Sequence, residues 1–280
     1  MEYKIRKATG KEVGAMVEWA AKEGWNPGIY DAKCFYTHDP NGFFVSVLGN
    51  QIIATVSAVK YGKNYGFMGF YIVKPKYRKK GYGMKLFQKA WDYLGNRNKG
   101  GDGVLENLKK YARIGFKLAH YNARYQGFGT GSRKIGPNIE NLRNIDFRKV
   151  AKYDDSVFGF KRYAFLKCWI NQSESFACGL VKNGKLLGYS VLRKCFEGYK
   201  IGPLFADNDS VANELFDSLI GSVDKKEKVF FDIPEVNKNA LKIVRKYKMK
   251  KVFATGRIYT KGQPKFPLQR WYGVTTFELG

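Results

Sequence analysis

The apolar positions in the first half of the chain follow a strand pattern over three successive runs. Residues 43–48, 51–59 and 67–73 have the length and the aromatic or β-branched composition of buried strands. The pair Gly49-Asn50 separates the first two runs and is a hairpin signal, and a second turn precedes the third run. We therefore predict three antiparallel strands that follow one another as a meander.

The pattern changes to a helical period directly after the third run. Pro75 cannot continue a strand ladder, and a basic glycine loop at residues 77–83 follows it. One face is then apolar at Met84, Leu86, Phe87, Ala90, Trp91 and Leu94. The loop is therefore predicted to lie between a strand and the start of a helix.

Shorter elements flank this unit. Residues 5–9 form a predicted strand, and Thr9 can cap a helix that follows it. The loop at residues 23–31 contains Trp25, and it either covers a pocket or is a connector with a core tryptophan. A further helical stretch around Tyr111 precedes a strand whose residues alternate in polarity.

The second half of the chain repeats this order of elements. A hairpin around Asn183-Gly184, a strand at residues 199–204 and a helix at residues 211–219 match the first half. Residues 274–279 alternate in polarity and are predicted to form a final strand.

A chain of 280 residues is long for one core and sufficient for two domains. The glycine-rich stretch near residue 128 has the composition of a linker. We predict a first domain at residues 1–127, a linker at residues 128–140 and a second domain at residues 141–280.

The composition adds a strong positive charge. The formal net charge is +26, and it is spread over both halves of the chain. A positive charge that is spread evenly fits a general attraction for acidic partners as well as it fits a groove for nucleic acid. A nucleic-acid partner is therefore not expected. No signal peptide or membrane-length apolar segment is recognisable, so we expect a cytoplasmic protein without membrane contact.

The residues for metal or thiol chemistry are few. Four cysteines show no C-x-x-C pairing, and the sequence has two histidines. A zinc site or a Cys/His nucleophile therefore has little material, and no metal is expected. We expect the four thiols to be reduced.

The glycine loop has the chemistry of an anion site. The first N–H groups of a helix lack intrahelical partners and attract anions. Gly81 and Gly83 permit positive φ and leave the backbone open to a ligand. Leu86 stands where a dinucleotide fingerprint requires its third glycine, and G-x-x-x-x-G-K-[ST] is missing from the sequence, so neither a dinucleotide nor an NTP is expected.

The strand, the pattern Arg78-x-x-Gly81-x-Gly83 and the helix resemble motif A of the GNAT superfamily of acyl-CoA-dependent N-acetyltransferases. Tyr111-x-x-x-Gly115-Phe116 is similar to the pattern near the end of many GNAT domains. The resemblance covers about residues 2–127. It implies an α/β (α+β) fold of two tandem GNAT-like domains, each with a mixed, mostly antiparallel central sheet flanked by helices.

The resemblance also implies a site for acetyl-CoA as co-substrate. The backbone of the third predicted strand would bond the pantetheine arm, and the glycine loop would hold the pyrophosphate. The expected cofactor-binding residues are Tyr71, Ile72, Val73, Arg78, Lys79, Lys80, Gly81, Tyr82, Gly83, Met84 and Asn107.

Transfer to an amine requires a base, and an acid for the departing thiolate. Tyr111 matches the family's tyrosine acid, although a tyrosine packed under the cofactor would give the same pattern. Some GNAT enzymes carry a glutamate as base early in the fourth strand, where this sequence has Phe67. Glu23 and Asp31 are the candidates for the base, and a water chain is the alternative. Trp25 and Asp31 are expected to contact the acceptor, a small-molecule or peptide amine bound between the domains.

The second half lacks the basic and glycine residues of the loop at residues 77–83. Asp207-Asn208-Asp209 replaces the basic and glycine residues, so carboxylates would face a pyrophosphate. We therefore predict an acetyl-CoA-dependent N-acetyltransferase with an intact first domain and a degenerate second one. The alternative is a non-catalytic protein that senses acyl-CoA or binds an anionic partner, such as a nucleic acid, on the same scaffold.

Overall fold

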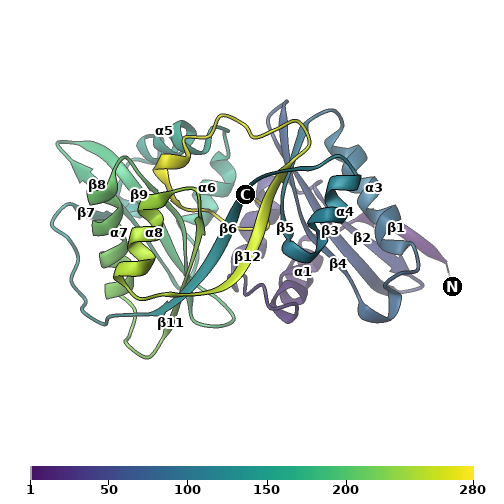
Figure 1. Ribbon diagram of the computed structural model, residues 1–280, viewed down its shortest axis with the longest axis horizontal. Coiled ribbons are helices and arrows are strands. Elements are labelled where there is room, and N and C mark those ends of the chain that lie inside the picture. Colours follow the sequence, from purple (N-terminus) through teal and green to yellow (C-terminus); the bar gives the residue numbers. More distant parts are fainter. Residues whose placement is uncertain (1) are drawn as a thin grey trace.

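The computed structural model describes residues 2–280 and shows two lobes that share one sheet (Figure 1). The first half contains β1 (Tyr3–Lys7), α1 (Gly10–Lys22), α2 (Asp31–His38), β2 (Phe43–Leu48), β3 (Gln51–Tyr61), β4 (Tyr65–Val73), α3 (Tyr82–Leu94), β5 (Asn98–Val104), α4 (Leu108–Arg113) and β6 (Lys117–Phe128). The second half contains β7 (Ile139–Asn141), α5 (Phe147–Phe158), α6 (Tyr163–Trp169), β8 (Ser175–Lys182), β9 (Lys185–Lys194), β10 (Tyr199–Ala206), α7 (Asp209–Gly221), β11 (Lys228–Pro234), α8 (Lys238–Lys246), β12 (Lys250–Tyr259) and β13 (Trp271–Gly273). The predicted fold class, a mixed and mostly antiparallel sheet flanked by helices, is confirmed.

The local signals in the sequence form the elements that they predict. Leu48 pairs with Gln51 across the first hairpin turn, and Lys182 pairs with Lys185 in the second half. Thr9 caps α1 in a capping box with Glu12, in which each side chain bonds the other residue's backbone. These short-range signals fix the meander and the helix starts.

The sheet passes from one half into the other because the two halves exchange a strand. β5 of the first half pairs with β12, β11 of the second half pairs with β6, and β6 and β12 pair with each other. These strands cross the middle of the molecule in Figure 1. The hydrogen bonds of β6 therefore join it to strands of the second half, although residues 117–127 of this strand belong to the predicted first domain.

A bulge distorts β4 where the sheet opens. Thr55 of β3 pairs with Ile72 and Ser57 pairs with Gly69, so β4 has one more residue than β3 over this stretch. Phe70 takes up the extra length with φ 49°, a conformation that non-glycine residues rarely adopt. Its carbonyl accepts a hydrogen bond of 2.8 Å from the Thr55 hydroxyl.

β4 and β5 separate at this bulge. They pair in parallel from Tyr65 and Asn98 to Met68 and Gly101, and no further. Within the described residues, the β4 backbone at residues 69–73 therefore pairs with β3 on one side and has no β5 partner on the other.

The predicted strand at residues 274–279 is wrong, because these residues form a buried turn. Thr276 supplies local acceptors, its Oγ1 for the N–H groups of Glu278 and Leu279 and its carbonyl for Gly280. The C-terminal turn, residues 274–280, packs against β4, where a Cβ on Gly69 would collide with the backbone of Glu278.

The expectation of four reduced thiols is also wrong. Cys34 in α2 and Cys168 in α6 form a disulfide with a Cα–Cα distance of 5.3 Å. Cys178 and Cys195 are buried free thiols. The bonded pair is 134 residues apart in the sequence, so spacing alone could not indicate it.

No helix within residues 2–280 is long and apolar enough to cross a membrane.

Candidate active site

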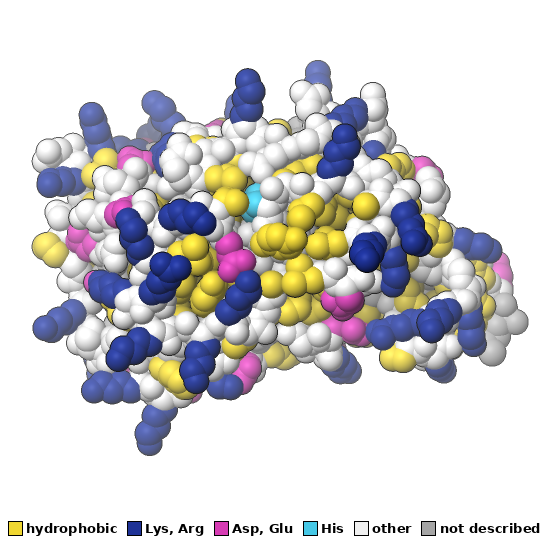
Figure 2. All heavy atoms as spheres, viewed as in Figure 1, with side chains coloured by type: hydrophobic (Ala, Val, Ile, Leu, Met, Phe, Trp, Pro, Cys, Tyr) yellow, Lys and Arg dark blue, Asp and Glu magenta, His cyan; other side chains and the backbone are white. Residues whose placement is uncertain are grey.

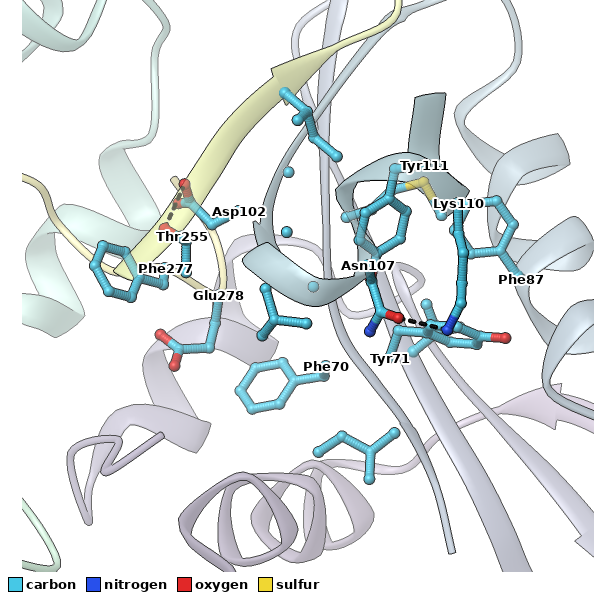
Figure 3. Close-up of a pocket in the computed structure, with 18 of the residues that line it drawn as sticks. Phe70, Tyr71, Phe87, Asp102, Asn107, Lys110, Tyr111, Thr255, Phe277 and Glu278 are labelled. Carbon is cyan, nitrogen blue, oxygen red and sulfur yellow. Dashed lines mark hydrogen bonds between the residues drawn. The ribbon is translucent and has the colours of Figure 1, made fainter. Parts of the chain in front are cut away.

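A cavity of about 640 Å³ lies where β4 and β5 separate, and both halves of the chain build its walls. The first half supplies β4, β5 and α4, and the second supplies β12 and the C-terminal turn. Figure 3 shows Tyr111, Asn107 and Lys110 on one side and Phe277 and Glu278 on the other. A smaller hollow of about 250 Å³ lies at the glycine loop and shares Tyr71 and Arg78 with the cavity.

Most of the residues expected from the sequence line one of these two spaces. The cavity is lined by Glu23, Trp25, Tyr71, Ile72, Val73, Arg78, Met84, Asn107 and Tyr111. The hollow adds three further expected residues, Lys79, Gly81 and Gly83. Lys80, Tyr82 and Asp31 line neither space.

The glycine loop holds the start of α3 open and close to β4. Gly81 is the N-cap with φ 82°, and a Cβ placed on it would lie in open space. A Cβ on Gly83 would lie only 2.6 Å from the Tyr71 hydroxyl and 2.8 Å from Val73, so glycine permits this approach. The open helix N-terminus beside an unpaired strand edge fits an elongated ligand with an anionic end.

Arg78 ties this loop to the strand and to the loop of Trp25. Its Nε donates a 2.8 Å hydrogen bond to the Val73 carbonyl, and its guanidinium lies 2.7 Å from a Glu23 carboxylate oxygen. The Arg78 and Glu23 side chains are 48% and 36% exposed, so this ion pair contributes little to stability. Glu23 therefore lies at the cavity rim, and its negative charge is already paired with the positive charge of Arg78.

Tyr111 lies on α4 with its ring against β5. Gly103 permits this contact, since a Cβ there would lie 2.9 Å from the ring. Burial raises the pKa of Tyr111 to about 12, and electrostatic interactions with Tyr71 and Glu106 raise this pKa by smaller amounts. The phenol is consequently a proton-bearing hydrogen-bond donor throughout the neutral range. On the same helix start, Asn107 accepts a 2.7 Å hydrogen bond from Lys110, drawn in Figure 3.

Asp31, one of the two expected bases, is placed elsewhere. Its carboxylate is fully buried and accepts hydrogen bonds from the Gly28 N–H at 2.8 Å, Gln172 at 3.3 Å and Arg193 at 2.9 Å. These partners occupy both oxygens, and two of them come from the second half. Asp31 is a buried link between the halves, and the structure does not bring it to the cavity.

Several cavity residues were missed from the sequence. They are Asp102 from β5, Phe253, Thr255 and Ile258 from β12, and Phe277 and Glu278 from the C-terminal turn. Their approach depends on contacts between distant segments. One available signal was Gly69, because an isolated glycine within a strand often marks a bulge or a close backbone approach.

The charge of the cavity differs from that of the molecule. Lys and Arg side chains are spread over the face shown in Figure 2, in keeping with the net charge of +26. The cavity wall instead contains four carboxylates, on Glu23, Asp102, Glu106 and Glu278, and two cations, on Arg78 and Lys110. Within residues 2–280 no group of three or more His, Cys, Asp or Glu could hold a metal ion.

Two family models match the chain, one in each half. The Acetyltransferase (GNAT) family model matches residues 12–116, and an Acetyltransferase (GNAT) domain model matches residues 150–273. A curated relative, holothin acyltransferase of Pseudoalteromonas sp. (strain SANK 73390), is 28% identical over 94% of this chain and 90% of its own length.

Solved structures share the arrangement of both halves. A Pyrococcus horikoshii protein assigned as an acetyltransferase has a TM-score of 0.83 at 20% identity and covers 99% of this chain and 96% of its own. A tandem GNAT protein from the clavulanic acid biosynthesis pathway has a TM-score of 0.64 at 11% identity, with coverage of 92% and 98%. At these identities the likeness concerns the fold.

Proposed function

Because the chain belongs to the GNAT superfamily, with a GNAT domain in each half, we propose that it is an N-acyltransferase with acetyl-CoA as donor and a primary amine as acceptor. One observation carries the proposal. The unpaired edge of β4 leads to the open N-terminus of α3, so hydrogen-bond donors for an acyl arm and for a pyrophosphate lie along one path.

The residues of the first half fit acetyl-CoA. The backbone of Tyr71, Ile72 and Val73 would bond the pantetheine arm, and the loop from Arg78 to Met84 would hold the pyrophosphate. Bound acetyl-CoA supplies an acyl group activated as a thioester. Backbone N–H groups next to the bulge would polarise the thioester carbonyl, an effect worth about 10²- to 10³-fold in rate per donor.

Tyr111 would stabilise the departing thiolate by donating a hydrogen bond. Its raised pKa of about 12 keeps the phenol protonated at neutral pH. A thiol has an ordinary pKa of about 8.5, so complete transfer of the phenol proton to sulfur is uphill. Tyr111 therefore acts mainly as a fixed donor to the developing negative charge, and solvent completes the protonation.

The acceptor would bind at the end of the cavity built by both halves. Trp25, Phe253 and Phe277 offer apolar surface there. Glu23 and Asp102 are paired with arginines, so the carboxylates that favour a cationic amine are those of Glu106 and Glu278. The relative from Pseudoalteromonas is named for holothin, which makes holothin the first acceptor to test. A peptide amine is a further candidate class of acceptor. The cytoplasmic location of the protein stays a prediction.

Calorimetric titration with acetyl-CoA tests the donor site directly. We expect one molecule bound per chain, and Gly81→Asp should lower the affinity at least about 100-fold because a carboxylate would face the pyrophosphate. Gly184→Asp is the matched control, since Gly184 also has positive φ, at 71°, with open space around its Cβ, and lies in the β8–β9 turn. Equal loss in both variants, or none in Gly81→Asp, would contradict the placement of the site.

Binding alone does not distinguish an enzyme from an acyl-CoA sensor. Release of free thiol from acetyl-CoA in the presence of holothin, or of a panel of primary amines, measures transfer. Tight acetyl-CoA binding without transfer to any amine would favour the non-catalytic alternative.

A further inference from the structure

Glu278 is a buried carboxylate in the cavity wall without an ion-pair partner in the described part of the chain. It is 4% exposed, and its Oε1 atom is buried with no hydrogen-bond partner among residues 2–280. Glu23 and Asp102, by contrast, are each paired with an arginine. A buried carboxylate normally has such a partner, because an unpartnered one costs folding free energy.

The position of Glu278 is fixed by the turn that carries it. Its N–H and that of Leu279 bond the Thr276 hydroxyl, at 3.2 and 2.9 Å, and the Leu279 carbonyl accepts a 2.8 Å hydrogen bond from Tyr61. Its backbone contacts Gly69 at the β4 bulge, where the strands open. Figure 3 shows Glu278 across the cavity from Tyr111. Glu278 therefore lines the cavity wall opposite the phenol, and its carboxyl is turned away from Tyr111 in Figure 3.

The cationic groups around Glu278 already have other partners. Arg124 on β6 bonds Asp232 of β11 at 2.7 Å, Arg193 on β9 bonds Asp31, and Lys200 on β10 bonds the Asn26 carbonyl at 2.5 Å. Burial raises the pKa of Glu278, and it outweighs the opposing attraction of Lys200 and Arg124, while the charges of Asp31 and Asp232 raise it further. Glu278 is therefore a stronger base than an ordinary surface glutamate.

We propose that Glu278 is the general base that takes the proton from the acceptor ammonium. The assignment rests on the proposed function and fills the role for which the first half offers Phe67 in place of a glutamate. The carboxylate removes one proton from the ammonium, and the freed lone pair forms the N–C bond as the C–S bond breaks and its electrons leave on sulfur. The second nitrogen proton passes to solvent, solvent protonates the sulfur, and Glu278 returns its proton to solvent.

Glu278→Gln tests this role, because the amide has nearly the same shape and cannot take up the proton. With acetyl-CoA and holothin, or 2-phenylethylamine if holothin is not a substrate, we expect kcat/KM to fall by at least about 100-fold while acetyl-CoA affinity stays unchanged. The wild-type rate should rise with pH along a limb centred above the ordinary glutamate range, and the variant should lack this limb. Glu227→Gln, on an exposed glutamate near Lys194, is the matched control.

A second measurement does not depend on the acceptor. A pKa that is raised in the folded state means that the carboxyl favours folding below its unfolded pKa and loses this contribution as pH rises through the folded pKa. Glu278→Gln should therefore be more stable than wild type at neutral pH, with the difference vanishing in acid. A purely structural glutamate would instead give a less stable variant.

The outcomes separate the two proposals. Loss of transfer together with a gain in neutral-pH stability supports the base. Unchanged transfer, or a variant that is less stable at neutral pH, overturns it. If wild type binds no acetyl-CoA, the proposed function fails first, and the stability measurement still decides whether Glu278 is an unpartnered carboxylate.

Discussion

The two halves of the molecule share one fold and differ at the place where a ligand could enter. In the first half β4 and β5 separate and leave a cavity. In the second half β10 and β11 pair from Tyr199 to Ile201, and beyond this point β13 pairs with β10 at Leu204 and Phe205. The chain itself therefore occupies in the second half the space that lies open in the first.

The loops before α3 and α7 also differ, because only the loop before α3 leaves the helix start open to a ligand. Gly81 presents an open helix start, whereas Asp207 bonds Arg270 and the Tyr153 hydroxyl. Asp209 accepts a hydrogen bond from Tyr272, which belongs to β13. The carboxylates that would repel a pyrophosphate thus hold the segment that fills the gap.

The third difference concerns the phenol. Phe116 N–H bonds the Tyr111 carbonyl at 3.1 Å, and Met249 N–H bonds the Val244 carbonyl at 2.9 Å, so the two helix ends have the same geometry. Val244 is buried and cannot donate a proton. The comparison teaches that a repeated backbone can keep its hydrogen bonds while the groups for chemistry are replaced.

Trp271→Ala is expected to have the largest effect on this comparison. Trp271 is 1% exposed, donates a 2.8 Å hydrogen bond to the Val157 carbonyl and stacks on Phe158. We expect a loss of about 3–5 kcal/mol in the free energy of unfolding, measured by urea denaturation, because β13 is part of the core. Phe196→Ala, at a half-exposed site, is the control. A loss below about 1 kcal/mol would mean that β13 only covers the surface.

Tyr111→Phe should give the next effect. We expect turnover to fall by about 100-fold with unchanged acetyl-CoA affinity, because only the donor to the thiolate is lost. Steady-state kinetics and calorimetry measure the two quantities. Tyr247→Phe, which removes a phenol from the second half, should leave turnover unaltered. An unchanged rate in Tyr111→Phe would remove this residue from the mechanism.

The double variant Asp207→Gly/Asp209→Gly should have the smallest effect on ligand binding. It removes the repulsive carboxylates and their hydrogen bonds to Arg270 and Tyr272. We expect β13 to stay in the gap because it still pairs with β10 and Trp271 is still buried, so the stoichiometry of acetyl-CoA should remain one per chain. Calorimetry gives this number. Two bound molecules would show that charge, rather than occupancy of the gap, excludes the ligand from the second half.

Elements with local causes could be predicted from the sequence. The capping box at Thr9, the turn at Gly49-Asn50 and the glycine loop at Gly81 each depend on neighbouring residues, and the structure contains all three. The residues expected around acetyl-CoA line the cavity or the hollow for the same reason, with Lys80 and Tyr82 as exceptions.

Features that depend on distant contacts could not be predicted. An alternating strand pattern does not say which sheet the strand joins, so the exchange of β6 and β12 left no mark in the sequence. The tail at residues 274–279 has such a pattern, yet Thr276 redirects it into a turn. The place of Glu278 beside Gly69, and the link from Asp31 to Arg193, follow from that long-range packing.

The strand exchange also determines how the chain must fold. Asp102 pairs with Arg257 across β5 and β12, more than 150 residues apart, and such high contact order slows folding because the loop entropy is lost before the pairing energy is gained. Neither half can complete its sheet alone. We therefore expect the two GNAT domains to unfold as one cooperative unit, with a single transition in place of two.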